Sequence, residues 1–111
     1  MAEEKNNEVK VVELGGNIKL TGFSELVPGS MTIIKKIVGT YTKRYAELVD
    51  DFTALEMVLK PIHKTEKVAK NFQVNAKMIH AGKVVAAEAE DRNVFKAIDD
   101  VLKKIEATVS K

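Results

Sequence analysis

Residues 83–111 read KVVAAEAEDRNVFKAIDDVLKKIEATVSK, a stretch that predicts a strand, a capped turn and one amphipathic helix. In the second half, apolar side chains recur at steps of three and four, at Val94, Ile98, Val101, Ile105 and Val109. Phe95 and Leu102 widen this stripe to the width with which a helix covers a sheet. Asn93 is the expected N-cap, because its side-chain oxygen can accept from the N–H groups of the first turn.

The remaining elements are predicted from the same kind of periodicity. Alternating apolar residues indicate strands at 9–22, 52–59, 72–78 and 83–89, and a lysine-rich connection is expected at 62–71. A helical pattern covers 31–49, and the residues on its apolar face are Ile34, Ile37, Val38, Tyr41, Tyr45 and Leu48. Gly39 inside that helix is expected to permit close packing, and Pro61 should end its strand or lie at an edge. The order β-α-β-β-β-α predicts an α/β fold of the α+β two-layer sandwich type. It consists of a four-stranded mixed sheet with both helices on one face.

Gly15-Gly16 interrupts the first strand, and two interpretations compete there. A two-residue turn would fold residues 9–14 back on 17–22 as a hairpin. A bulge would instead keep one long, kinked strand. The kinked strand is favoured, because the apolar alternation keeps its parity across the two glycines.

The amino-acid composition excludes several classes of function. The 111 residues are 45% hydrophobic and 31% charged, which is typical of one folded domain. The absence of Cys excludes disulfides and thiol catalysis, and no apolar run reaches the length of a membrane span. His63 and His80 have no second ligand at metal-site spacing. We therefore expect a cytoplasmic protein that is not an enzyme, with no cofactor, metal, membrane or small-molecule substrate.

Basic residues gather in two places although the net charge is only +2. Residues 60–83 hold six lysines against one glutamate. The helix at 31–49 carries Lys36 and Lys43 opposite its apolar face, flanked by Lys35 and Arg44. The sequence does not decide which of these two basic surfaces contacts a nucleic acid.

The closing stretch Asn93-Val94-Phe95-Lys96-Ala97-Ile98-Asp99, with Lys104-Ile105, resembles the last helix of ribosome hibernation-promoting factors. Upstream, the segment Ile18-Lys19-Leu20-Thr21-Gly22 is similar to that family's first strand. Asn93 replaces the family's usual Asp, and Ala107-Thr108 stands where members carry Arg-Gln. Residues 1–8 are polar and are expected to form a flexible tail. The resemblance implies the short form of the family, with a single hibernation-factor-like domain over 9–111.

The resemblance implies an rRNA-binding protein, monomeric when free, that docks on the small ribosomal subunit near the decoding channel. There it would inhibit translation and preserve idle ribosomes as part of a stress response. The alternative is a protein-interaction or homodimeric α/β domain that does not bind RNA and uses an exposed edge strand. The predicted RNA-binding residues are basic side chains of the two helices and of the 60–83 segment: Lys35, Lys36, Lys43, Arg44, Lys64, Lys67, Lys70, Lys96, Lys103 and Lys104.

Overall fold

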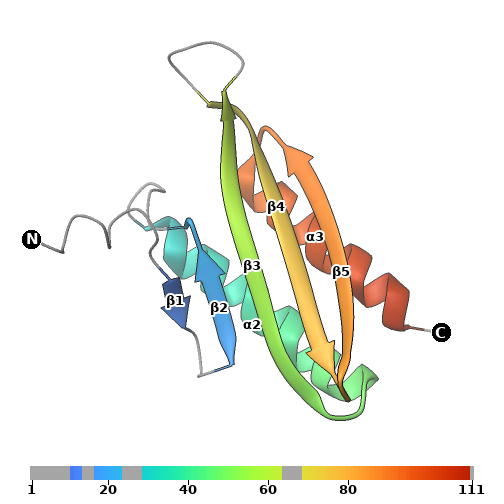
Figure 1. Ribbon diagram of the computed structural model, residues 1–111. Helices are drawn as coiled ribbons and strands as arrows, with labels where there is room; N and C mark the ends of the chain where they lie inside the picture. The colour runs from blue at the N-terminus through green and yellow to red at the C-terminus, as the bar shows by residue number, and fades with distance from the viewer. Residues whose placement is uncertain (1–10, 14–16, 24–28, 64–68, 111) are drawn as a thin grey trace, which may run out of the picture.

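The computed structural model describes residues 11–13, 17–23, 29–63 and 69–110 (Figure 1). The predicted tail at 1–8 lies outside this range. The elements, in chain order, are β1 (Val11–Glu13), β2 (Ile18–Thr21), α2 (Ser30–Leu48), β3 (Phe52–His63), β4 (Ala69–His80), β5 (Lys83–Asp91) and α3 (Val94–Val109).

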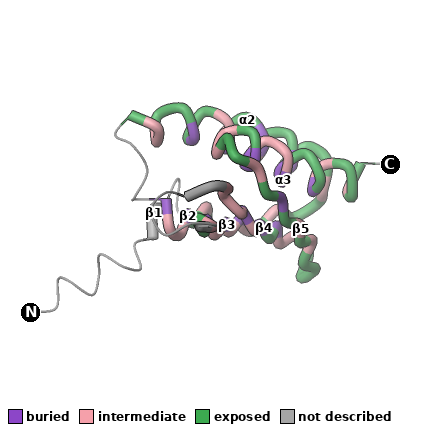
Figure 2. The backbone as a smooth tube through the Cα atoms, turned by 90° about the horizontal axis from the view of Figure 1, so that it is seen from above, coloured by how far each residue is buried: buried purple, intermediate pink, exposed green. Residues whose placement is uncertain are grey.

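The described strands form one sheet in the order β1-β2-β3-β4-β5. β2 and β3 pair in parallel across α2, whereas the other neighbours are antiparallel. Both helices cover the same face of the sheet, and none of the described helices lies on the opposite face (Figure 2). The predicted α+β sandwich is therefore confirmed: β2 to β5 are its four strands, with the order β-α-β-β-β-α.

The N-terminal strand is a hairpin, so the favoured kinked-strand interpretation is wrong. β1 pairs with β2 in antiparallel register, with Val12 opposite Leu20, and adds a short fifth strand at the edge. Gly15-Gly16 itself lies outside the described residues. Alternation alone did not distinguish the two cases, since the same parity suits a continuous strand and one folded back on itself.

β3 and β4 are longer than predicted. β3 runs through Pro61 to His63, and β4 begins at Ala69, so much of the lysine-rich connection expected at 62–71 is strand. Proline is tolerated because β2 pairs β3 only along Leu55–Val58. At Pro61, β4 is therefore the only described strand beside β3, which agrees with the predicted edge position.

The core lies between the sheet and the helices. Its fully buried side chains include Phe23, Ile34, Leu55, Met78 and Ile98, and the whole predicted stripe of α3 faces it. The apolar prediction fails at Leu48, which is 42% exposed. Leu48 lies in the last turn of α2, where it lines a shallow groove with His80 and Val109.

Two glycines differ in what surrounds them. Gly22 has φ +85°, and a Cβ there would lie 2.4 Å from the carbonyl oxygen of Leu59, so the backbones of two strands approach where no side chain fits. Gly39 was expected to permit close packing, and this is wrong, since a Cβ there would meet nothing within 4 Å. Its burial is only intermediate because it faces away from the sheet-side core.

Asn93 caps α3 as predicted. Its side-chain oxygen accepts from the N–H groups of Phe95 at 2.9 Å and Lys96 at 3.2 Å. Asp91 in turn accepts from the N–H of Asn93 at 2.9 Å. The start of the helix is thus set by hydrogen bonds within a few residues of each other.

Candidate nucleic-acid interface

The two helices lie side by side and run in parallel (Figures 1 and 2). The Tyr41 hydroxyl donates to a carboxylate oxygen of Asp99 at 2.9 Å, and the Tyr45 hydroxyl donates to the carbonyl of Leu102 at 2.7 Å. Residue numbers rise in the same direction along both helices in these pairs. The hydrogen bonds fix the helix spacing, so the solvent-facing sides of α2 and α3 form one continuous surface.

The tyrosine hydroxyls hold their protons. Burial, followed by the hydrogen bond to Asp99, raises the pKa of Tyr41 to about 12. Burial also raises the pKa of Tyr45. The guanidinium of Arg44 lies 4.9 Å from the centroid of the Tyr41 ring. Both tyrosines were predicted only as apolar core residues. The sequence signal for these hydrogen bonds was the presence of Tyr rather than Phe on the buried side of α2, because a buried hydroxyl needs a hydrogen-bond partner.

We define the helix face as the outward basic residues of both helices: Lys36, Lys43, Arg44, Lys96 and Lys103. All five are exposed. On α2, the buried Ile34, Val38, Tyr41 and Tyr45 point to the sheet, which turns Lys36 and Lys43 to the opposite side. Lys35 is also exposed and lies on the flank of α2.

Three cations of the helix face have carboxylate partners. Lys96 pairs with Asp100 at 3.3 Å and Lys103 with Asp99 at 3.4 Å, each within α3. Arg44 pairs across the helices with Glu106 at 3.2 Å. Within the described residues, no ion pair joins Lys35, Lys36 or Lys43 to a carboxylate. The net positive charge of the helix face is therefore concentrated on α2.

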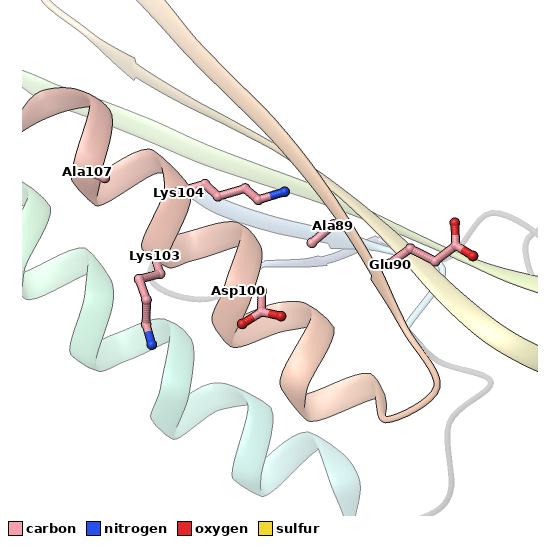
Figure 3. A pocket seen from close by; sticks show the side chains of 6 residues that line it. All are labelled: Ala89, Glu90, Asp100, Lys103, Lys104 and Ala107. Atoms are coloured by element: carbon pink, nitrogen blue, oxygen red, sulfur yellow. The ribbon is translucent and has the colours of Figure 1, made fainter.

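Lys104 does not join the other helix cations. Its ammonium donates to the backbone carbonyl of Glu88 in β5 at 2.8 Å. Figure 3 shows its side chain extending from α3 to β5, while that of Lys103 points away from the strand. The sequence placed both lysines on one polar side of the helix. Adjacent residues are about 100° apart, however, and that separation carries Lys104 past the edge of the helix face.

The basic residues of the 60–83 segment are described only in part. Lys64 and Lys67 lie outside the described residues, and Lys70 belongs to β4. Lys77 is exposed on the open face of the sheet, away from the helices, because its neighbours Ala76 and Met78 are buried. The structure thus brings the cations of α2 and α3 together and separates Lys77 from them.

In the parts of the chain that the structure describes, no three His, Cys, Asp or Glu side chains are grouped to hold a metal ion. None of the described helices is long and apolar enough to cross a membrane. His80 lines the groove beside Leu48, and His63 ends β3.

Solved structures with this fold include two of similar size. A ribosomal subunit interface protein from Coxiella burnetii superposes with a TM-score of 0.60 at 16% identity, covering 84% of this chain and 92% of that chain. The N-terminal domain of Thermus thermophilus Protein Y gives a TM-score of 0.55 at 22% identity, covering 69% and 79%. At these identities the likeness shows the fold.

Among curated proteins, a sequence search finds no match. The sequence profile of one family, however, matches residues 31–111, from the first turn of α2 through the whole of α3. This range includes the capped closing motif and both helices of the helix face. Because it covers well over half of the chain, the protein belongs to the Sigma 54 modulation protein / S30EA ribosomal protein family.

Proposed function

We propose that this protein is a cytoplasmic, non-enzymatic ribosome-associated factor that binds rRNA of the small ribosomal subunit near the decoding channel. Bound there, it inhibits translation and stabilises idle ribosomes, and it is a monomer when free. Family membership and the fold of a ribosomal subunit interface protein support ribosome association. The observation that supports RNA binding is the helix face, where Lys36 and Lys43 are exposed on α2 and form no ion pair with any described carboxylate.

Electrostatics explains why such a surface suits RNA. Each lysine that neutralises a phosphate releases condensed counterions, which favours binding and makes it dependent on salt. On α2 the lysines are held on a packed helix, so binding costs little additional ordering of the backbone. The α2 lysines are therefore the anchors of the proposed interface.

The cations that already have carboxylate partners contribute less in this proposal. Lys96 and Lys103 of α3 and Arg44 of α2 each exchange a carboxylate for a phosphate on binding. Exposed ion pairs are worth only about 0–1 kcal/mol, so this exchange is possible but yields less than a new contact. In this proposal the lysines of the 60–83 segment, Lys64, Lys67 and Lys70, assist the binding of RNA.

The aromatic residues favour recognition of folded RNA. The chain has four Phe and two Tyr, and each is buried or half-buried. Proteins that bind single strands stack bases on exposed aromatic rings. A basic surface without such rings suits the shape and backbone of structured RNA instead.

Co-sedimentation with purified small ribosomal subunits at two salt concentrations tests the proposal. The double variant Lys36→Ala/Lys43→Ala should bind weakly, and its log K should depend less on log salt by roughly one per lysine. The matched control is Lys19→Ala/Lys77→Ala, which removes the same charge from the open sheet face. It should bind like the wild type.

Other outcomes would change the proposal. If only Lys96→Ala/Lys103→Ala loses binding, the anchor lies on α3 rather than on α2. If the wild type binds without salt dependence and no variant differs from it, the protein-interaction alternative replaces RNA binding.

A further inference from the structure

β5 is the last strand of the sheet, so one of its edges has no described strand beside it. β4 and β5 are joined by the two-residue connection Ala81-Gly82, and His80 pairs with Lys83. In such hairpins the pair next to the turn is hydrogen-bonded, and hydrogen-bonded pairs then alternate along the ladder. Lys83 and every second residue after it thus bond to β4, and the backbone groups of the residues between them point outward.

The outward backbone groups belong to Val84, Ala86, Glu88 and Glu90. All four residues are exposed, and Val84 is 58% exposed. A row of outward N–H and C=O groups is a template for pairing with another strand. Beside it, between β5 and α3, lies a groove of about 350 Å³ whose lining includes Ala89 and Ala107. Because these side chains are small, they leave space beside the β5 edge.

Lys104 is the side chain that occupies this edge. Its ammonium bonds to the outward carbonyl of Glu88 at 2.8 Å, near the middle of β5 (Figure 3). A strand that added to the edge would compete for this carbonyl and would displace the charged group into a less hydrated position. Proteins commonly blunt edge strands with lysine for this reason.

The edge is self-complementary. β5 starts with Lys83 and ends with Glu90 and Asp91. Antiparallel pairing of two copies about Ala87 places the outward residues opposite each other and sets Lys83 against Asp91 of the second copy, twice by symmetry. Opposite charges then meet at both ends and Ala87 meets its own copy in the middle, while Glu88 and Glu90 lie opposite Ala86 and Val84 rather than opposite another carboxylate. A second copy of this chain therefore fits the edge in register, with an ion pair at each end.

We propose that the β5 edge is a latent self-pairing surface for a second copy of this chain, and that Lys104 keeps it closed. This proposal does not depend on RNA binding. In the wild type, the ammonium on the Glu88 carbonyl maintains the monomer. Without it, the sheets of two copies join into one continuous sheet across the paired β5 strands.

Sedimentation velocity over a concentration series tests this proposal. Lys104→Ala, and Lys104→Met which retains most of the aliphatic stem, should self-associate at least about tenfold more tightly than the wild type. Lys103→Ala removes the same charge from a neighbouring residue that also lines the groove but pairs with Asp99 and points away from β5, and this variant should associate no more than the wild type. In the dimers, amide exchange should slow at Val84 and Ala86.

Adding Ala86→Pro to Lys104→Met distinguishes this edge from other surfaces. The Ala86 N–H points outward, so proline there removes a donor to a partner strand but none to β4. The double variant should return to a monomer. Two results would overturn the proposal: both Lys104 variants remaining as monomeric as the wild type while folded by circular dichroism, or dimers that persist with Ala86→Pro.

Discussion

Glycine to alanine is the same chemical change at two positions of this chain, and the structure predicts opposite effects on stability. At Gly22, φ is +85° and the new Cβ would lie 2.4 Å from the Leu59 carbonyl oxygen. Real Cβ contacts are not this short, so the backbone of β3 or of residue 22 must move. At Gly39, in the middle of α2, the new Cβ meets nothing within 4 Å.

The magnitudes follow from these surroundings. An alanine in the left-handed region costs about 1–2 kcal/mol by itself. Forcing a clash against backbone in a packed region adds about 1–3 kcal/mol. Gly22→Ala should therefore lower the free energy of unfolding by about 2–5 kcal/mol. Gly39→Ala should raise it by up to about 1 kcal/mol, because alanine loses less conformational entropy in a helix than glycine does.

Urea titration followed by circular dichroism measures both changes on the same scale. A domain of this size typically has about 5–15 kcal/mol of stability, so Gly22→Ala would remove a large part of it. Unfolding of Gly22→Ala at the wild-type urea concentration would contradict the predicted clash with Leu59. A larger loss of stability in Gly39→Ala than in Gly22→Ala would mean that Gly39 is in close contact with another element.

Three further predictions concern the closing helix and its contacts. Asn93→Ala should cost about 1 kcal/mol in urea titration, whereas Asn93→Asp should be neutral or stabilising, and equal losses would mean that the cap lies elsewhere. Ile98 is fully buried, so Ile98→Ala should cost about 2–5 kcal/mol, and a loss under about 1 kcal/mol would contradict the assigned helix phase. The raised pKa of Tyr41, about 12, means that the folded state keeps a proton that the unfolded chain loses near pH 10, so stability should be full below about pH 10 and decline from there to about pH 12. Tyr41→Phe/Tyr45→Phe should flatten this decline in stability curves measured at several pH values, and an unchanged slope would exclude the two hydroxyls as its cause.

The position and buried side of α3 could be predicted from the sequence because they depend on residues close together in the chain. One face of a helix is set by the 3.6-residue period, so five apolar positions suffice to assign the buried side of α3. The cap at Asn93 needs only the N–H groups two and three residues later. Strand alternation likewise identified the inward residues Leu55, Met57 and Leu59.

Other features depend on residues that are far apart in the chain. The partner of Tyr41 is 58 residues away, and that of Arg44 is 62 residues away. The ion pair between Arg44 and Glu106 follows from the spacing of α2 and α3 in space, whereas Lys96 and Lys103 pair with carboxylates four residues away within α3. No local pattern encodes that spacing.

The sequence alone therefore determined the type of each main element, its buried face, the cap of α3 and the resemblance to a ribosomal family. Tertiary structure decided that β1 folds back on β2, that Gly22 rather than Gly39 meets a neighbouring backbone, and that Lys104 reaches the edge of the sheet. The physical reason is the range of the interactions. Periodicity and capping act over a few residues, whereas strand pairing, close backbone approach and the direction of a long side chain depend on which elements become neighbours in the fold.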